Sequence, residues 1–284
     1  MSQPRNRMMD YLREEIMPHR FCTGCGCGTV LNVFTHAVDE LKLDPTRMVC
    51  VSGIGCSAWI PSPYFKADTL HTTHGRPIAF ATGVKVMRPD LKVIVIAGDG
   101  DVSGIGGNHL IHAARRNIDL TVIMVNNMIY GMTGGQVAPT TPTGVHTKTT
   151  PYGNIEQPFK AADLVLAAGA TYVSRWTTYH VFPLLKSMKA AIDKKGFSFV
   201  EIVSQCPDNY GRRIGLRKAN DFLHKFKDES VRISKARDMS EEELKDKIVV
   251  GTLCDRDRPE YVTELHRITT EQVENLKSEM ERAS

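Results

Sequence analysis

The sequence predicts an α/β fold with a mainly parallel sheet that is covered by helices on both faces. Two observations lead to this prediction. The 284-residue chain contains continuous apolar runs rich in β-branched residues, which are typical of strands buried on both faces. Segments with the apolar spacing of helices lie between these runs. Because 42% of the residues are hydrophobic, the chain is able to bury a large core.

The expected strands and helices alternate along the first 203 residues. The strands are predicted at 48–52, 91–97, 120–125, 171–174 and 197–203. The helices are predicted at 76–87, 104–116, 155–169 and 179–194. Residues 137–154 are dense in Thr, Pro and Gly, and a loop of that length within a compact domain is usually functional.

After about Gly211 the chain becomes charged and its strand signal disappears. We therefore divide it into an α/β domain of residues 1–211 and a charged C-terminal extension of residues 212–284, which we expect to dock a partner. Within the extension, Ser240 followed by Glu243 predicts the capping box of a helix. Basic residues outnumber acidic ones between Arg212 and Arg237, which indicates either an ordinary solvated surface or a docking site.

Charge and hydropathy exclude several classes of protein. A net charge of +4 is too mild to favour nucleic-acid binding. No apolar run approaches the ~20 residues of a membrane span, and the N-terminus lacks the apolar core of a signal peptide. We therefore expect a cytoplasmic protein without a membrane or nucleic-acid partner. In that compartment the seven cysteines are expected to be core thiols, catalytic thiols or metal ligands rather than disulfides.

Motifs of small and polar residues follow four of the expected strands. The sequence GIGCS follows Ser52, GDGD follows Ala97, NN follows Val125, and QCP comes shortly after Val203. In an open parallel sheet, ligands bind beyond the carboxyl ends of the strands. The four motifs therefore predict a single site at this edge of the sheet.

The GDGD motif is typical of a loop that approaches a phosphate, and three kinds of phosphate site compete for it. A Walker A loop is excluded because the chain lacks its Gly-Lys-Ser/Thr ending. A dinucleotide fingerprint is disfavoured because Ser103 stands where its third glycine is needed. In the third interpretation Asp99 binds a Mg²⁺ ion that carries a diphosphate, since Mg²⁺ prefers oxygen ligands and commonly bridges protein to phosphate.

GDG followed about 27 residues later by NN resembles the thiamine diphosphate signature of the diphosphate-binding module. The resemblance implies that Mg²⁺ is bound by Asp99, the side chain of Asn127 and the backbone carbonyl of Ile129. It further implies four contacts to the diphosphate, from Gly100, Asp101 and the backbone of Gly131 and Met132. A tight turn next to an Asn-rich strand end is the simpler alternative.

The cysteines suggest a second centre at the same edge. Cys22 and Cys25 have C-x-x-C spacing, which redox, zinc and iron–sulfur sites all use. Together with Cys56 in GIGCS and Cys206 in QCP they form a set of four thiolates that could hold a [4Fe–4S] cluster. The remaining cysteines are expected to be core or spare thiols: Cys27, Cys50 and Cys254.

The order of these motifs from Cys22 to Tyr210 resembles the β subunit of the 2-oxoacid:ferredoxin oxidoreductases. The resemblance implies a thiamine diphosphate-binding fold and a [4Fe–4S] cluster held by Cys22, Cys25, Cys56 and Cys206. It also implies a cofactor lining made of Ile54, Gly55, Cys56, Ser57 and His74. We expect His74 to be catalytic, as a neutral imidazole that donates to the substrate carbonyl oxygen, whereas His71 has an equal claim to a structural role.

The resemblance implies an enzyme that decarboxylates a 2-oxoacid oxidatively, in either direction, to form acyl-coenzyme A and CO₂ while it reduces ferredoxin. It favours 2-oxoglutarate, because Gly134 stands where some broad-specificity relatives carry Lys; pyruvate and branched-chain 2-oxoacids remain alternatives. Thiamine enzymes also need a Glu from a pyrimidine-binding module, for which this chain has no room. We therefore expect an α subunit to supply it, in an (αβ)2 heterotetramer.

Two other functions stay open at this point. A thiamine-dependent decarboxylase without a cluster would leave the four thiolates unexplained. A non-catalytic electron-transfer or zinc subunit would leave the GDGD and NN motifs without a purpose.

Overall fold

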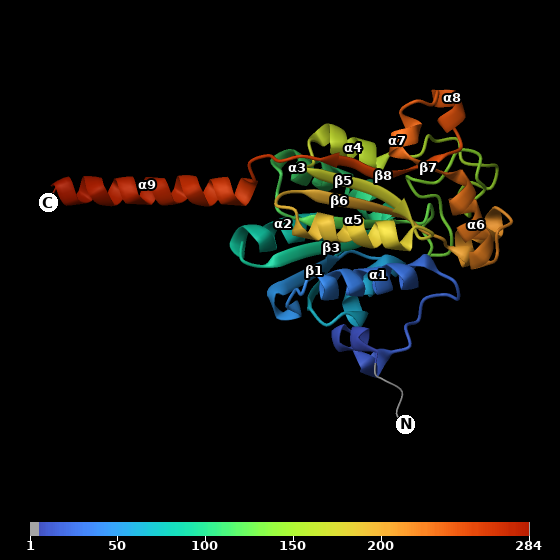
Figure 1. Ribbon diagram of the computed structural model, residues 1–284, viewed down its shortest axis with the longest axis horizontal. Coiled ribbons are helices and arrows are strands. Elements are labelled where there is room, and N and C mark those ends of the chain that lie inside the picture. Colours follow the sequence, from blue (N-terminus) through green and yellow to red (C-terminus); the bar gives the residue numbers. More distant parts are fainter. Residues whose placement is uncertain (1–5, 284) are drawn as a thin grey trace.

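The computed structural model describes residues 6–283, which form a layered α/β molecule around one eight-stranded sheet (Figure 1). The strand order is β2-β1-β3-β4-β6-β5-β8-β7. The first six strands are parallel to one another, which confirms the predicted fold class. They are β1 (Met48–Ser52), β2 (Asp68–His71), β3 (Lys92–Gly98), β4 (Thr121–Asn126), β5 (Tyr172–Thr177) and β6 (Ser198–Val203).

Both faces of the sheet are buried under helices, which explains the continuous apolar runs. On one face, α1 (Gly26–Glu40) and α5 (Val181–Asp193) pack on side chains such as Ile94 and Ile96. On the other face, Val93 and Val95 belong to a second core, which contains residues of three further helices. These are α2 (Pro77–Met87), α3 (Gly107–Arg116) and α4 (Ala161–Ala168).

The five predicted strands are all present, with ends that differ by a few residues. Two predicted helices begin later than expected. The helix expected from residue 104 begins at Gly107, because Gly104 adopts a non-helical conformation (φ −80°, ψ −109°). The helix expected from residue 155 begins at Ala161, after the backbone of Phe159 has bonded to Pro139 instead.

The expectation that strands end near Gly211 is wrong. Strand β8 (Ile248–Asp255) pairs antiparallel with β5, and β7 (Ser230–Arg232) pairs parallel with β8. The strand signal of β8 is weak because its buried Val250 is followed by Gly251 and by the exposed Thr252. The boundary at residue 211 remains a prediction, but part of the extension belongs to the main sheet.

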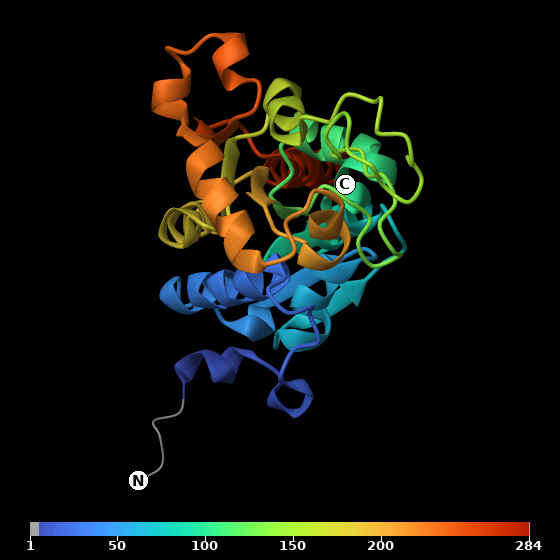
Figure 2. The same ribbon diagram turned by 90° about the vertical axis from the view of Figure 1, so that its right-hand side faces the viewer.

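The extension also contains four helices within the described residues. They are α6 (Ala219–Glu229), α7 (Ile233–Ala236), α8 (Glu241–Leu244) and α9 (Tyr261–Ala283). The predicted capping box is confirmed at the start of α8, where Ser240 Oγ accepts from Glu243 N at 3.2 Å and Glu243 Oε2 accepts from Ser240 N at 2.7 Å. Helix α9 projects away from the body of the molecule in Figure 1, and Figure 2 shows the same helix end-on. None of the helices in residues 6–283 combines the length and apolar character of a membrane span.

The topology creates a crevice beside β1. The chain passes from β1 to β2 on one side and then returns to β3 on the other side. At such a switch point the connections leave in opposite directions, so the carboxyl ends of the two strands face an open space. The loops that follow β1, β3 and β4 meet there.

Candidate active site

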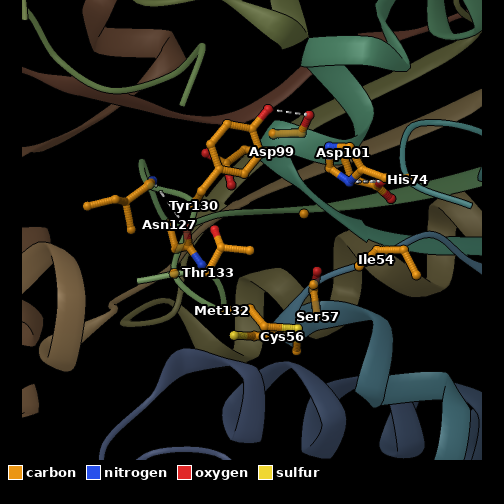
Figure 3. Close-up of a pocket in the computed structure, with 15 residues that line it drawn as sticks. Ile54, Cys56, Ser57, His74, Asp99, Asp101, Asn127, Tyr130, Met132 and Thr133 are labelled. Carbon is orange, nitrogen blue, oxygen red and sulfur yellow. Dashed lines mark hydrogen bonds and ion pairs between the residues drawn. The ribbon is translucent and has the colours of Figure 1, made fainter. Parts of the chain in front are cut away.

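A cavity of about 390 Å³ lies beyond the carboxyl ends of β1, β3 and β4 (Figure 3). Its volume is that of a small-molecule or cofactor site. The lining residues are Ile54, Gly55, Cys56, Ser57, His74, Gly98, Asp99, Gly100, Asp101, Asn127, Ile129, Tyr130, Gly131, Met132 and Thr133. The structure thus brings together every residue that the sequence assigned to thiamine diphosphate or Mg²⁺, although their roles stay predictions.

The turn after β3 requires glycine at position 100. A Cβ atom on Gly100 would overlap the ring of Tyr130. The Tyr130 hydroxyl donates to the Gly100 carbonyl oxygen at 3.1 Å, so the ring closes over the turn. Sequence reasoning missed Tyr130 and Thr133 as lining residues, although both lie in the quoted segment after the NN motif.

Asp99 is buried at the end of β3 and has the character of a cation ligand. Its side chain accepts a hydrogen bond from the Thr140 hydroxyl. Burial raises the pKa of Asp99 to about 6, against the opposing effect of hydrogen bonds from Thr140 and from the backbone of Asn127. A bound cation would favour the charged carboxylate. The other two oxygens proposed for Mg²⁺, on Asn127 and Ile129, belong to residues that line the same cavity.

The long loop at 137–154 is attached to the site through Thr140. Sequence analysis predicted a functional loop but did not single out this residue. Thr140 is 4% exposed, and its bond to Asp99 ties the loop to the end of β3. The next residue, Thr141, donates to the Met128 carbonyl oxygen at 2.7 Å, so the loop also holds the segment after β4.

His74 and Asp101 form a pair on the opposite wall (Figure 3). His74 Nδ1 lies 2.9 Å from Asp101 Oδ1, which also accepts from the Gly75 backbone N–H at 2.5 Å. Burial raises the pKa of Asp101, and the hydrogen bond from Gly75 and the nearby His74 oppose that rise. Because its carboxylate is engaged in this way, any contact of Asp101 with a diphosphate would come from its backbone N–H.

The contact with Asp101 argues against the neutral His74 ring as a donor from Nε2. A carboxylate beside Nδ1 favours a proton on that nitrogen, so Nε2 of His74 would donate to a substrate oxygen only from the doubly protonated ring. His71 does not line the cavity, and its Nδ1 lies 3.1 Å from Ser52 Oγ. The structure therefore favours the structural interpretation for His71.

The four cysteines of the expected cluster set gather next to this cavity. Cys25 caps α1, Cys56 follows β1 and Cys206 follows β6. Burial, followed by the charges of the other three thiols, raises the pKa of Cys56 to about 12. Burial and the charge of Cys25 likewise raise the pKa of Cys22, which is exposed.

The four thiols have the donor chemistry of an iron–sulfur cluster. Among the residues that the structure describes, no three His, Cys, Asp or Glu side chains lie close enough together to hold one metal ion. The thiols of Cys22, Cys25, Cys56 and Cys206 influence one another's pKa, and thiolates of cysteine are the ligands that iron–sulfur clusters use. The donor chemistry therefore fits a [4Fe–4S] cluster.

Cys50 and Cys254 have other surroundings, whereas Cys27 lies among the proposed ligands and is influenced by Cys25, Cys56 and Cys206. Cys27 is buried at the start of α1, where its hydrogen bond to Cys25 lowers the pKa of Cys25 to about 7 and raises its own. Cys50 is fully buried in β1, and this burial raises its pKa to about 12. Cys254 Sγ lies 3.8 Å from the carbonyl oxygens of Ala170 and Thr171. Cys50 and Cys254 therefore lie apart from the thiol set, and leaving Cys27 out of the ligand set stays a prediction.

The cavity and the thiols are neighbours. Cys56 lines the cavity itself. A Cβ atom on Gly131 would lie 3.5 Å from Cys206 Sγ, and Asn209 Nδ2 donates to the Gly131 carbonyl oxygen at 2.8 Å. Only a short distance of protein would therefore separate a ligand in the cavity from a group bound by the thiols.

Comparison with known proteins supports the same assignment. Residues 53–202 match the family model "Thiamine pyrophosphate enzyme, C-terminal TPP binding domain". The chain is 55% identical over 271 residues to the 2-oxoglutarate synthase subunit KorB of Methanocaldococcus jannaschii, covering 95% of this chain and 98% of the relative. The chain belongs to the KorB family.

More distant KorB relatives agree with this placement. The chain is 45% identical over 188 residues to the 2-oxoacid:ferredoxin oxidoreductase subunit beta of Saccharolobus solfataricus, covering 66% of this chain and 62% of that one. It also resembles a solved 2-oxoglutarate:ferredoxin oxidoreductase from Magnetococcus marinus with 2-oxoglutarate, coenzyme A and succinyl-CoA bound. That match has a TM-score of 0.84 and 33% identity, and it covers 95% of this chain and 92% of the solved chain. The sequence-based assignment to the β subunits of this enzyme class is confirmed.

The matched family model covers the predicted thiamine diphosphate site but only part of the predicted cluster site. The matched thiamine domain contains every predicted contact of the cofactor and of Mg²⁺, from Ile54 to Met132. It contains Cys56 but not Cys22, Cys25 or Cys206. A thiamine diphosphate-binding domain is therefore established, whereas Mg²⁺ and the cluster rest on the geometry described above.

Proposed function

We propose that this chain is the β subunit of a 2-oxoglutarate:ferredoxin oxidoreductase. The reaction would convert 2-oxoglutarate, coenzyme A and two oxidised ferredoxins into succinyl-CoA, CO₂, a proton and two reduced ferredoxins. The observation that carries the proposal is the contact between the cavity and the thiols, at Cys56 and at Gly131 beside Cys206. The relatives named for 2-oxoglutarate favour this substrate.

Different residues of the cavity wall would bind the Mg²⁺ ion, the diphosphate and the rest of the cofactor. Asp99, Asn127 and the carbonyl of Ile129 would bind Mg²⁺, which bridges protein oxygens to phosphate. The diphosphate would be held by Gly100, the backbone of Asp101, and the backbone of Gly131 and Met132. The lining of the rest of the cofactor would come from Ile54, Gly55, Cys56 and Ser57. When bound, thiamine diphosphate supplies a nucleophilic carbon and a sink for the electrons released by decarboxylation.

His74 would act as the catalytic group of this chain. Asp101 fixes the ring through Nδ1, so Nε2 is left to face a ligand in the cavity. In the doubly protonated ring, Nε2 would be a donor that needs no reorganisation when negative charge develops on the substrate oxygen, and that is the condition for effective electrostatic catalysis. Asp101 acts through His74 and is therefore a positioning residue.

The thiolates of Cys22, Cys25, Cys56 and Cys206 would hold a [4Fe–4S] cluster that accepts electrons singly. Cys22 is the exposed member of the set, whereas the other three are partly buried. An electron would therefore enter from the buried side next to the cavity and leave toward ferredoxin on the side of Cys22. The partly buried thiolates would help to set a low reduction potential.

The proposed enzyme needs an α subunit. A thiamine enzyme requires a carboxylate on a second module, and this chain supplies the diphosphate module alone. We propose that the α subunit provides that carboxylate together with much of the substrate and coenzyme A pocket, in an (αβ)2 heterotetramer. The cytoplasmic location expected from the sequence stays a prediction.

The test is the activity of the chain produced anaerobically with its α subunit. Reduction of a viologen dye is measured with 2-oxoglutarate, pyruvate and 2-oxoisovalerate, with and without coenzyme A. We expect coenzyme A-dependent reduction with the highest kcat/KM for 2-oxoglutarate. A preference for pyruvate or 2-oxoisovalerate would contradict the substrate assignment, and CO₂ release without dye reduction would favour the non-redox decarboxylase.

A further inference from the structure

A buried polar chain runs across three neighbouring strands behind the proposed Mg²⁺ site. Glu201 of β6 is 3% exposed, and its Oε2 accepts from Arg175 Nε of β5 at 2.7 Å. Its Oε1 accepts from Asn126 Nδ2 at the end of β4 at 2.8 Å. The proposed function does not use any of these three residues.

This series of hydrogen bonds ends at Met128, a residue with an unusual backbone conformation. Asn126 Oδ1 accepts from the Met128 backbone N–H at 3.2 Å. Met128 has φ +61°, in the left-handed region that side chains other than glycine rarely adopt. Its carbonyl oxygen accepts from the Thr141 hydroxyl at 2.7 Å. Both polar groups of the Met128 backbone are therefore held by side chains from other positions.

Met128 is the single residue between Asn127 and Ile129, which would supply two of the Mg²⁺ ligands. Its backbone angles therefore set the direction of the Ile129 carbonyl relative to the Asn127 side chain. Neither Asn126 nor Met128 lines the cavity, so neither is placed to touch the cofactor. Their effect on a ligand would pass through the shape of the turn.

The burial of two charged side chains, Glu201 and Arg175, also needs an explanation. A buried ion pair seldom adds stability beyond what two apolar side chains of similar volume would give. Such a pair does fix the rotamer of the carboxylate. Here Arg175 holds Oε2 of Glu201, and the other oxygen, Oε1, accepts from Asn126. The pair is thus arranged to orient the Asn126 amide.

We propose that Glu201 and Asn126 are positioning residues for the cation. They hold Met128 in the left-handed conformation, so that Asn127 and the Ile129 carbonyl face the same Mg²⁺ ion. The inference rests on the Mg²⁺–thiamine diphosphate site of the proposed function. It also explains the paired asparagines: the second provides a ligand oxygen, and the first shapes the turn.

The test measures Mg²⁺ affinity directly. The complex with the α subunit is stripped with EDTA and supplied with saturating thiamine diphosphate, and Mg²⁺ is titrated while cofactor binding is followed by protein fluorescence. We expect Asn126→Ala and Glu201→Ala to raise the Kd for Mg²⁺ by about 10- to 100-fold, as is usual for partners of metal ligands. Glu201→Gln keeps an oxygen for Asn126 and should raise the Kd by less than about tenfold.

Asn117→Ala is the matched control. Asn117 lies just before β4, is 1% exposed, and its Oδ1 accepts from the Phe197 backbone N–H at 2.8 Å. It also adopts a left-handed conformation, with φ +53°. Its loss should therefore lower the melting temperature as much as the loss of Asn126 does, while the Kd for Mg²⁺ remains unchanged.

A double variant tests the mechanism itself. Glycine adopts left-handed angles without strain. Met128→Gly in the Asn126→Ala background should therefore keep the fold and restore most of the lost Mg²⁺ affinity. The inference is overturned if Asn126→Ala binds Mg²⁺ like the wild type, if Asn117→Ala weakens binding equally, or if the double variant shows no recovery. Failure of the wild-type complex to bind thiamine diphosphate with Mg²⁺ would instead contradict the proposed function.

Discussion

At the scale of single residues, the site depends on close approaches that only glycine allows. The carboxylate of Asp101 packs directly against Gly53, and its Oδ2 has no hydrogen-bond partner in the part of the chain that the structure describes. The other oxygen, Oδ1, holds His74 and Gly75. The end of β1 therefore fixes the position of the His74 ring through a single carboxylate.

Gly53→Ala tests this dependence. The added methyl group would overlap the Asp101 carboxylate, so either the carboxylate or the end of β1 must move. We expect kcat to fall at least tenfold and the free energy of unfolding to fall by about 1–3 kcal/mol. Gly83→Ala in α2 is the control, because a Cβ there meets open space and should stabilise the helix by about 0.5–1 kcal/mol. Equal behaviour of the two variants in urea unfolding and turnover would contradict the account.

Asp99→Asn separates ligand binding from stability. The pKa of Asp99 is raised to about 6, so its charged form destabilises the metal-free fold above that pH, and this penalty disappears as the pH falls below it. At pH 8 the neutral amide should therefore make the metal-free protein at least as stable as the wild type. Mg²⁺-dependent binding of thiamine diphosphate should be lost at the same time. A stable variant with wild-type cofactor affinity would show that Asp99 does not bind the cation.

At the scale of elements, the sheet brings together motifs that lie far apart in the sequence. Cys25, Cys56 and Cys206 come from α1, the end of β1 and the end of β6. The rule that carboxyl ends of parallel strands share an edge predicted that Cys56 and Cys206 would meet. Cys25 follows no strand, and its place in the set was predicted from the C-x-x-C spacing and the family resemblance. The sequence could not show that the Cys27 thiol affects the pKa of Cys25, because that contact depends on how α1 begins.

Replacement of single cysteines tests the ligand set. Cys206→Ala removes a proposed ligand and should abolish most of the bound iron. Cys27→Ala is the matched control, since it removes a buried thiol from the same region and should keep the full iron content. Iron and acid-labile sulfide are measured in the complex purified without oxygen. Loss of iron in both variants, or in neither, would contradict the assignment.

The sequence predicted the central strands well because both of their faces are buried, as with Ile94 and Val95 of β3. It missed β8 because one side of that strand is partly exposed and Gly251 interrupts its pattern. The hydrogen bonds of Thr140 and Thr141 were also beyond prediction. They depend on how a loop without regular structure folds back over the strand ends.

Truncation tests the role of the C-terminal extension in the fold. A chain that ends at residue 211 lacks β8, which covers the edge of β5, and should fail to give a cooperative melting transition. A chain that ends at residue 266 keeps the buried Glu260 and Val262 and loses only exposed residues of α9. It should melt within a few degrees of the full chain. Cooperative unfolding of the shorter chain would support an independent domain at 1–211.

At the scale of the whole molecule, the chain is a subunit of a larger enzyme. One edge of the sheet carries a cavity for thiamine diphosphate and, beside it, four thiols with an exposed corner at Cys22. The far end carries α9, which stands clear of the body (Figure 1). The central claim is that cofactor and cluster occupy neighbouring sites in this single chain.

The most direct measurement is the cofactor content of the complex with its α subunit, purified without oxygen. The account predicts one thiamine diphosphate and about four irons with matching sulfide per copy of this chain. It also predicts that 2-oxoglutarate with coenzyme A changes the visible absorption of the cluster. Thiamine diphosphate without iron, in an assembled complex that still decarboxylates 2-oxoglutarate, would contradict it.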